Sequence, residues 1–457
     1  MAKRFHILSL EPIALQLIKW IKKPVLETSG LFKRCYEFVG VPKHKKGILK
    51  IISSLVLASL LSVATYVLTN RPISDGKANA YIGDLNFYFG FDGSDRLNTA
   101  TFLENVVCIN VAFDKEIVTY RDSISGVTRG EMAITNREKL ATLLEISKNQ
   151  HKYMFIDILL DPEVSSVNDS LLYSALSITE RVLVPSYYKG GQLVTPDVSA
   201  NTGFSGFKVT DENERFLKYS FIHTDSIKSV ALRMYEELDN GELTKGAIFD
   251  TSNGDLSLSS LLLALRVGPF DQYRIDGRLN YYDLGTQLLD SLVIEKVSAI
   301  VKDKIVLVGD FESSDEHLTQ IGHLAGPIIH YNAYLALQNN DHKISNTLIA
   351  TVFFVFFLFL LNVLFSWNVS FWAVIKVTLM KKKWLKQGAK NKALSTIYHL
   401  FLKGLFVVID ASLLLLLLSY LVYNIFGIHM DVFWLSIPFI FLIIILHRIR
   451  SPQKFTI

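Results

Sequence analysis

The chain of 457 residues holds 47 Lys or Arg and 43 Asp or Glu, and its formal net charge is +4 at pH 7. This near balance hides opposite charges in different segments, so the overall charge says little about partners. The two cysteines, Cys35 and Cys108, fall on opposite sides of a predicted membrane, which excludes an intramolecular disulfide.

Four apolar runs are long enough to cross a bilayer, because a hydrocarbon core of about 30 Å requires about 20 apolar residues of helix. They are Ile48–Leu68, Thr347–Trp367, Leu405–Phe426 and Ile428–Leu446. No small-residue cleavage pattern ends the first run, so it is interpreted as a retained signal anchor. The sequence therefore predicts an all-α region of four transmembrane helices, at 48–68, 347–367, 405–426 and 428–446.

The placement of Lys and Arg orients these helices, because basic flanks stay in the cytoplasm. Residues 1–50 hold 11 Lys or Arg, whereas segment 70–346 holds 25 Lys or Arg and 38 Asp or Glu, a balance of 25 − 38 = −13. The pattern predicts a cytoplasmic basic amphipathic arm at 1–47, an extracytoplasmic domain at 70–346, a basic cytoplasmic loop at 368–404 and a cytoplasmic tail at 447–457.

Within the outer segment, short apolar runs alternate with helical patterns. Near-continuous apolar stretches, typical of strands covered on both faces, are Val106–Phe113, Tyr153–Leu160, Val182–Val184 and Ile305–Val308. Helices are predicted after the capping box formed by Thr135 and Glu138, from Asp169, and from Asp225. This alternation predicts an α/β domain, layered, with a largely parallel sheet.

Two weaker sequence signals predict loops, edge strands and a turn in the same domain. Residues 187–224 are rich in Gly, Ser, Asn and Thr and are interpreted as loops and edge strands, and Asp276-Gly277 reads as a hairpin turn. Cys108 lies in the first predicted strand, where a buried small hydrophobe is favoured over a reactive thiol.

The order of these pieces resembles CHASE2, an extracytoplasmic sensory domain of bacterial signalling proteins that is followed by three transmembrane helices. The resemblance lies in Asp84 after the first span, the strand at Val106–Asp114, Asn136-Arg137, Tyr153–Asp157 with Asp161-Pro162, Lys304–Gly309, the Gly-Phe passage in Gly203–Met234, and Gly326–Ala333 before the second span. The Trp-rich residues that precede the family's Arg are absent here.

The resemblance implies a bacterial cytoplasmic (inner) membrane protein that senses an external signal. Such sensory regions are commonly joined to a cyclase, kinase or phosphodiesterase, and no such module is expected after Leu446. We therefore expect a signal to leave through the membrane helices, the basic loop or the arm. A rigid path is expected in one helix that begins near Pro327 and continues into Thr347–Trp367.

Candidate ligand-binding residues lie at the predicted strand ends. Asp114, Asp157 and Asp310 each follow a core strand, and ligands of open α/β sheets bind at such carboxyl ends. Together they could bind a cation or a cationic ligand. The alternative, which the sequence favours, is that they cap helices or pair with Arg137. No zinc spacing joins His317, His323 and His330 in the sequence, and His330 is expected in the core.

Polar residues inside the predicted spans are also candidates. Asp410 lies in the third span and Asn362 in the second, at similar predicted depth. A hydrogen bond that locks the two helices is favoured over proton or ion conduction.

The basic loop carries Lys381, Lys382, Lys383 and Trp384, in a pattern typical of an interfacial helix. Attraction to anionic membrane lipid explains this pattern, and docking of a cytoplasmic effector is the alternative.

No catalytic motif, nucleotide loop or cofactor signature occurs in the sequence, so an enzyme is not expected. The predicted function is a transmembrane sensor or receptor subunit that relays a signal to a separate cytoplasmic effector. The alternatives are a structural or scaffold subunit of a membrane complex and, third, a small-solute or ion transporter. The expected partners are the effector and anionic lipid, with homo-oligomerisation left open and nucleic acid not expected.

Overall fold

The computed structural model describes residues 43–71, 104–121, 128–206, 218–268, 280–365 and 412–442, with short gaps inside these ranges. The chain divides into two compact units. One comprises residues 1–68, 346–426 and 430–457, and the other comprises 69–345 and 427–429. Each unit is described by itself.

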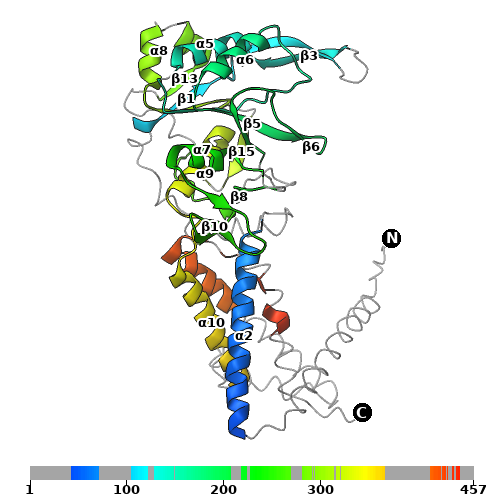
Figure 1. The fold of residues 1–457 in the computed structure, drawn as a ribbon, viewed down its shortest axis with the longest axis vertical. Helices are drawn as coiled ribbons and strands as arrows, with labels where there is room; N and C mark the ends of the chain where they lie inside the picture. Colours follow the sequence, from blue (N-terminus) through cyan, green and yellow to red (C-terminus); the bar gives the residue numbers. More distant parts are fainter. Residues whose placement is uncertain are drawn as a thin grey trace, which may run out of the picture. The chain divides into compact units, whose positions relative to one another are not determined.

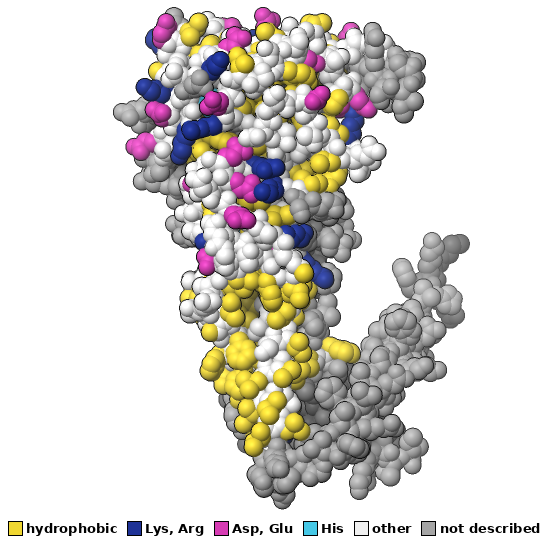
Figure 2. Space-filling view, viewed as in Figure 1, with side chains coloured by type: hydrophobic (Ala, Val, Ile, Leu, Met, Phe, Trp, Pro, Cys, Tyr) yellow, Lys and Arg dark blue, Asp and Glu magenta, His cyan; other side chains and the backbone are white. Residues whose placement is uncertain are grey.

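The first unit contains the long apolar helices α2 (Lys43–Thr69) and α10 (Asn346–Phe365). Many of their large apolar side chains are exposed, such as Leu60 at 61% and Phe354 at 58%, as expected of surfaces that face lipid rather than water. Figure 2 shows that hydrophobic side chains dominate these helices, whereas Lys, Arg, Asp and Glu gather on the other unit.

Two long apolar helices, not the predicted four, have membrane length among the described residues: Gly47–Thr69 and Asn346–Phe365. The predicted third span is described only from residue 412, where a shorter apolar helix covers Ser412–Tyr423. Most of the fourth lies outside the described residues.

The second unit is built on a mixed sheet of seven strands in the order β13-β1-β14-β4-β5-β6, with β7 also paired to β5. The strands are β1 (Val106–Asn110), β4 (Tyr153–Ile156), β5 (Val182–Lys189), β6 (Gln192–Val194), β7 (Asn201–Phe204), β13 (Tyr281–Asp283) and β14 (Ile305–Gly309). All pairs are parallel except β5 with β6. The predicted α/β domain with a largely parallel sheet is therefore confirmed.

Helices cover both faces of this sheet (Figure 1). On one face, alternate strand residues such as Ile109 and Val308 join a core with α5 (Arg137–Ser147), α6 (Asp169–Ile178), the π-helix η2 (Leu284–Leu289) and α8 (Ile294–Val301). On the other face lie α7 (Val230–Asp239) and α9 (Gly326–Gln338). Burial on both faces explains why the strands read as continuous apolar runs.

Four smaller sheets occur in the described part of this unit. They are the hairpin β2 (Lys115–Arg121) with β3 (Thr128–Thr135), the hairpin β15 (Glu316–Thr319) with β16 (Gly322–Ala325), the pair β8 (Lys218–Ser220) with β12 (Ser260–Leu262), and the three strands β9 (Leu243–Thr244), β10 (Asp250–Ser252) and β11 (Asp255–Ser257). The prediction of edge strands in 187–224 is confirmed by β5 to β8, and the hairpin turn at 276–277 lies outside the described residues.

Several predicted boundaries are wrong. Asn136, not Thr135, caps α5, because its side chain accepts a hydrogen bond from the Lys139 amide. The helix predicted from Asp225 begins at Val230, because Ser229 caps it in the same way.

The predicted continuous helix from Pro327 into the second span is also wrong. α9 ends at Gln338, Asn340 has a left-handed backbone with φ of 61°, and α10 begins at Asn346. Residues 339–345 therefore connect two separate helices, and no single rigid helix joins the sheet edge to the second apolar helix.

Candidate functional site at the carboxyl edge of the sheet

The candidate site is the edge at which β1, β14 and β4 end. These three strands are parallel neighbours, so their carboxyl ends meet on one side of the sheet, where ligands of α/β folds bind. The predicted carboxylates Asp114, Asp310 and Asp157 follow these three strands in that order. Each carboxylate, however, faces a different partner.

Asp114 joins two elements that cover the sheet. It is buried, and its Oδ1 accepts a hydrogen bond of 2.6 Å from Lys139 Nζ of α5, while Oδ2 accepts one of 2.9 Å from the Gly285 amide of η2. The hydrogen bond to Asp114 raises the pKa of Lys139. Asp114 is therefore a structural acceptor at this edge, engaged on both oxygens.

Asp310 and Arg137 form separate ion pairs. Asp310 Oδ2 lies 3.7 Å from Lys115 Nζ, whose side chain is about one-third exposed. Arg137 pairs instead with Asp169 at the start of α6, with 3.3 Å between Nε and Oδ1. Burial lowers the pKa of Arg137, and the charge of Asp169 opposes that effect. The predicted pairing of Arg137 with the three strand-end carboxylates does not occur.

Asp157 differs from the other two because its side chain lies beside a buried histidine rather than a lysine. Its Oδ2 lies 3.9 Å from His330 Nε2 of α9, and the exposed fractions of the two side chains are 9% and 2%. The other ring nitrogen of His330 is hydrogen-bonded to the Tyr219 hydroxyl at 2.7 Å, and the imidazole packs edge-on against Phe155. The expectation that His330 lies in the core is confirmed.

Burial shifts both members of this pair toward their neutral forms. It raises the pKa of Asp157 well above its usual range, and the nearby charge of Asp315 adds to the rise. Burial also lowers the pKa of His330 to about 3, with a further contribution from His317. The pair is therefore a buried acid and imidazole, at the sheet edge and in α9, whose charged forms are both disfavoured by burial.

A glycine brings α9 against this edge. A Cβ at Gly309, the last residue of β14, would lie 2.6 Å from Pro327 Cγ and 3.4 Å from Asp157 Cβ. Only glycine allows this close approach, since real Cβ atoms do not come that near to other atoms. The strand-ending glycine of the sequence motif thus places the start of α9 beside Asp157.

The segment around Asp315 covers the start of α9. The Gly326 amide donates a hydrogen bond of 2.9 Å to the Asp315 carbonyl, and a Cβ at Gly326 would collide with the Asp315 carboxylate. His317 of β15 lies 3.2 Å from Asp315 Oδ1. Residues 315–317 therefore add an acid and a titratable histidine beside the Asp157–His330 pair.

Asn332, two residues after His330 in α9, contacts another part of the domain. The Asn332 side chain accepts a hydrogen bond from the Val267 amide at 2.9 Å and donates one to the Val267 carbonyl at 3.0 Å. α9 is thereby joined to the sheet edge through His330 and to residue 267 through Asn332.

In the part of the chain that the structure describes, no group of three or more His, Cys, Asp or Glu side chains could hold a metal ion. The ligand-binding role of Asp114, Arg137, Asp157 and Asp310 stays a prediction. Asn362 lies in α10, whereas Asp410, Lys381, Lys382, Lys383 and Trp384 lie outside the described residues.

Asn110 also contributes to this edge and was not predicted from the sequence. Asn110 at the end of β1 is fully buried; its Oδ1 accepts the Phe311 amide at 3.3 Å and its Nδ2 donates to Asp283 Oδ1 at 2.9 Å. A polar side chain that closes an otherwise apolar strand is the signal that could have found it.

Comparisons with known proteins agree with this architecture. The family model described as the CHASE2 domain matches residues 99–367, more than half of the chain. Searches of curated proteins and of solved structures found no match. A sensory domain of this family, together with two apolar helices of membrane length, indicates a signal-sensing membrane protein with an extracytoplasmic domain.

Proposed function

This chain belongs to the CHASE2 domain family, and from that premise we propose that it is a bacterial inner-membrane sensor subunit that relays an external condition to a separate cytoplasmic effector. The family match carries this proposal. In it, segment 70–346 receives the signal outside the membrane, and the basic segments pass it on inside.

The charge distribution supports this orientation. Segment 70–346 has a net charge of −13 from 25 basic and 38 acidic residues, whereas the connection 368–404 holds eight Lys and no acid. Basic segments beside apolar helices remain in the cytoplasm and bind anionic lipid, each Lys or Arg contributing about 1 kcal/mol near the surface. We propose that the arm at residues 1–47 and the loop at 368–404 face the cytoplasm and that segment 70–346 lies outside the membrane.

Reporter fusions along the chain test the orientation. Fusions after Tyr81 and at Asn340 should give an extracytoplasmic signal, whereas fusions at Gln387 and after Ile457 should give a cytoplasmic one. A cytoplasmic signal at Asn340 would overturn the proposal, because the sensory domain would then face the cell interior.

The relay is tested at the basic loop. Changing Lys381, Lys382 and Lys383 together to Gln removes the charges that we propose a partner reads. The variant should insert and fold as before but should retain less of the cytoplasmic effector on purification in mild detergent. Full retention of the effector would assign the loop to lipid contact alone and would favour the arm at residues 1–47 as the docking element.

A further inference from the structure

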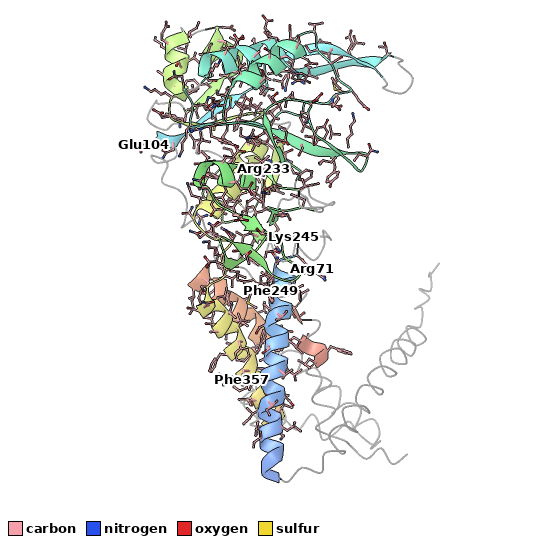
Figure 3. The ribbon with its side chains drawn as sticks, viewed as in Figure 1. Arg71, Glu104, Arg233, Lys245, Phe249 and Phe357 are labelled. Atoms are coloured by element: carbon pink, nitrogen blue, oxygen red, sulfur yellow. The ribbon has the colours of Figure 1, made fainter. Side chains whose placement is uncertain are left out.

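The main part of the second unit, residues 69–345, begins and ends in two short segments. The first, the entry segment, consists of Thr69, the last residue of α2, with Asn70 and Arg71, and the second, the exit segment, is residues 341–344, which precede α10. Figure 3 labels Arg71 together with Lys245 and Phe249, which mark the loop between β9 and β10. α9 and α10 are separate helices, so the sensory domain is connected to α2 through the entry segment and to α10 through the exit segment.

The entry segment is held through the side chain of Asn70. Its Oδ1 accepts hydrogen bonds from the amides of Ser259 and Ser260, at 2.7 and 3.2 Å. Its Nδ2 donates one of 2.6 Å to Asp250 Oδ2. Lys218 Nζ adds hydrogen bonds to the carbonyls of Thr69 and Arg71.

The exit segment is held by the same short stretch of chain. The Leu258 amide donates to the His342 carbonyl at 2.8 Å, and the Ile344 amide donates to the Leu256 carbonyl at 2.8 Å. His342 Nε2 is hydrogen-bonded to Ser252 Oγ at 2.9 Å. His342 is fully buried, so these bonds are shielded from water.

Consecutive backbone amides thus hold the two segments, since Leu258 donates to the exit segment and Ser259 to the entry segment. The neighbouring strand β10 repeats the arrangement, with Asp250 bound to Asn70 and Ser252 bound to His342. None of these hydrogen bonds involves the parallel sheet, so residues 250–260 hold the two segments independently of that sheet.

We propose that residues 250–260 are a clasp that fixes the entry segment at the end of α2 and the exit segment before α10 to each other, so that both segments move as one unit when the sensory domain changes state. Arg266 joins this clasp to α9: its guanidinium binds both carboxylate oxygens of Asp341, and the adjacent Val267 is bound by Asn332. The inference rests on the proposed function only for its role in signalling.

Amide hydrogen exchange of the full chain in lipid nanodiscs tests whether the clasp couples the segments. Asn70→Ala removes the side chain that holds the entry segment. If the clasp acts as one unit, exchange should rise about tenfold not only at Ser259 and Ser260 but also at Leu258 and Ile344, whose hydrogen bonds join the clasp to the exit segment.

A milder variant makes the reciprocal test. Ser252→Ala deletes only the hydroxyl that binds His342, and it should raise exchange at Ser259 and Ser260, which bind Asn70. Asn201→Ala is the matched control, because it removes an exposed amide hydrogen bond to Glu237 elsewhere in the same unit and should leave all four amides unchanged.

The proposal is overturned if Asn70→Ala raises exchange only at Ser259 and Ser260 and Ser252→Ala leaves these two amides unchanged. That outcome would show two independent attachments. Since the measurement needs no effector, failure of the relay to a cytoplasmic partner would leave its result intact, and the two failures are distinguishable.

Discussion

His330 of α9 lies with its Nε2 atom 3.9 Å from Asp157 Oδ2, and both side chains are buried where β4 ends. The pair connects two parts of the family motif that are far apart in the sequence. It also makes the stability of the domain depend on pH, because burial shifts the pKa of each group toward its neutral form.

Acidification should destabilise the protein through His330. Its pKa is about 3 in the folded state and about 6.5 when unfolded, so the unfolded chain binds more protons between these values. The free energy of unfolding contributed by His330 is therefore fully present above about pH 6.5 and is lost as pH falls. In thermal unfolding of the full chain in detergent, the midpoint temperature should decrease as the pH is lowered below about 6.5.

A variant that lacks only the histidine at position 330 separates this effect from general acid denaturation. His330→Gln keeps a polar side chain beside Tyr219 but cannot be protonated, so the midpoint should depend less on pH between 4 and 6.5. An equally steep dependence in the variant would assign the effect to other groups.

Asp157→Asn should stabilise the protein at neutral pH. The pKa of Asp157 is raised by burial, so the folded state binds more protons than the unfolded one from about pH 3.9 up to the raised value. Stability is lost as pH rises through that window, and a neutral Asn does not incur this loss. The midpoint at pH 7.5 should rise.

Asp310→Asn is the matched control at the same sheet edge. It removes the charge that pairs with Lys115, while the amide oxygen can still accept the Glu312 amide. A partly exposed ion pair contributes about 0.2–1 kcal/mol, so a small decrease is expected. An equal gain from both variants would show that net charge, rather than burial of Asp157, limits stability.

Gly309→Ala should destabilise the domain by about 1–3 kcal/mol, because a methyl group at this position collides with Pro327 and pushes α9 from the sheet edge. Chemical denaturation of the full chain measures the loss. Gly47→Ala, where nothing lies within 4 Å of the new Cβ, should be neutral or stabilising. Similar effects of the two substitutions would reject the close approach.

Cys108 should resist modification in intact membranes. The thiol is fully buried in β1, and burial raises its pKa, so the reactive thiolate is suppressed. A membrane-impermeant maleimide should label it only after denaturation. Rapid labelling of the native protein would contradict its burial in the sheet.

The sequence predicted the parallel sheet because strands such as Val106–Asn110 and Ile305–Gly309 are buried on both faces and therefore read as continuous apolar runs. It did not predict β9 to β12, because strands of two or three residues show no periodicity. The clasp is built from these short strands and was therefore missed.

The sequence predicted which carboxylates follow the core strands but not the side chains with which they form ion pairs and hydrogen bonds. The strand-end rule placed Asp114, Asp157 and Asp310 at one edge, since a residue after a parallel strand has a fixed place. Partners such as Lys139 and Asp169 come from helices, and their choice depends on how each helix rotates against the sheet. That rotation is set by packing of the whole core rather than by local sequence.

In the proposed relay, a change in the sensory domain alters the exposure of the basic loop at the inner face of the membrane. The rate at which trypsin cleaves Lys381–Lys383 in inverted membrane vesicles measures this exposure. We expect Asp157→Asn to change the rate, because stabilising one state of the outer domain shifts the equilibrium of the whole protein, and we expect Asn201→Ala to leave it unchanged. Identical cleavage in the wild type and in a folded Asp157→Asn variant would contradict a relay from the outer domain to the loop.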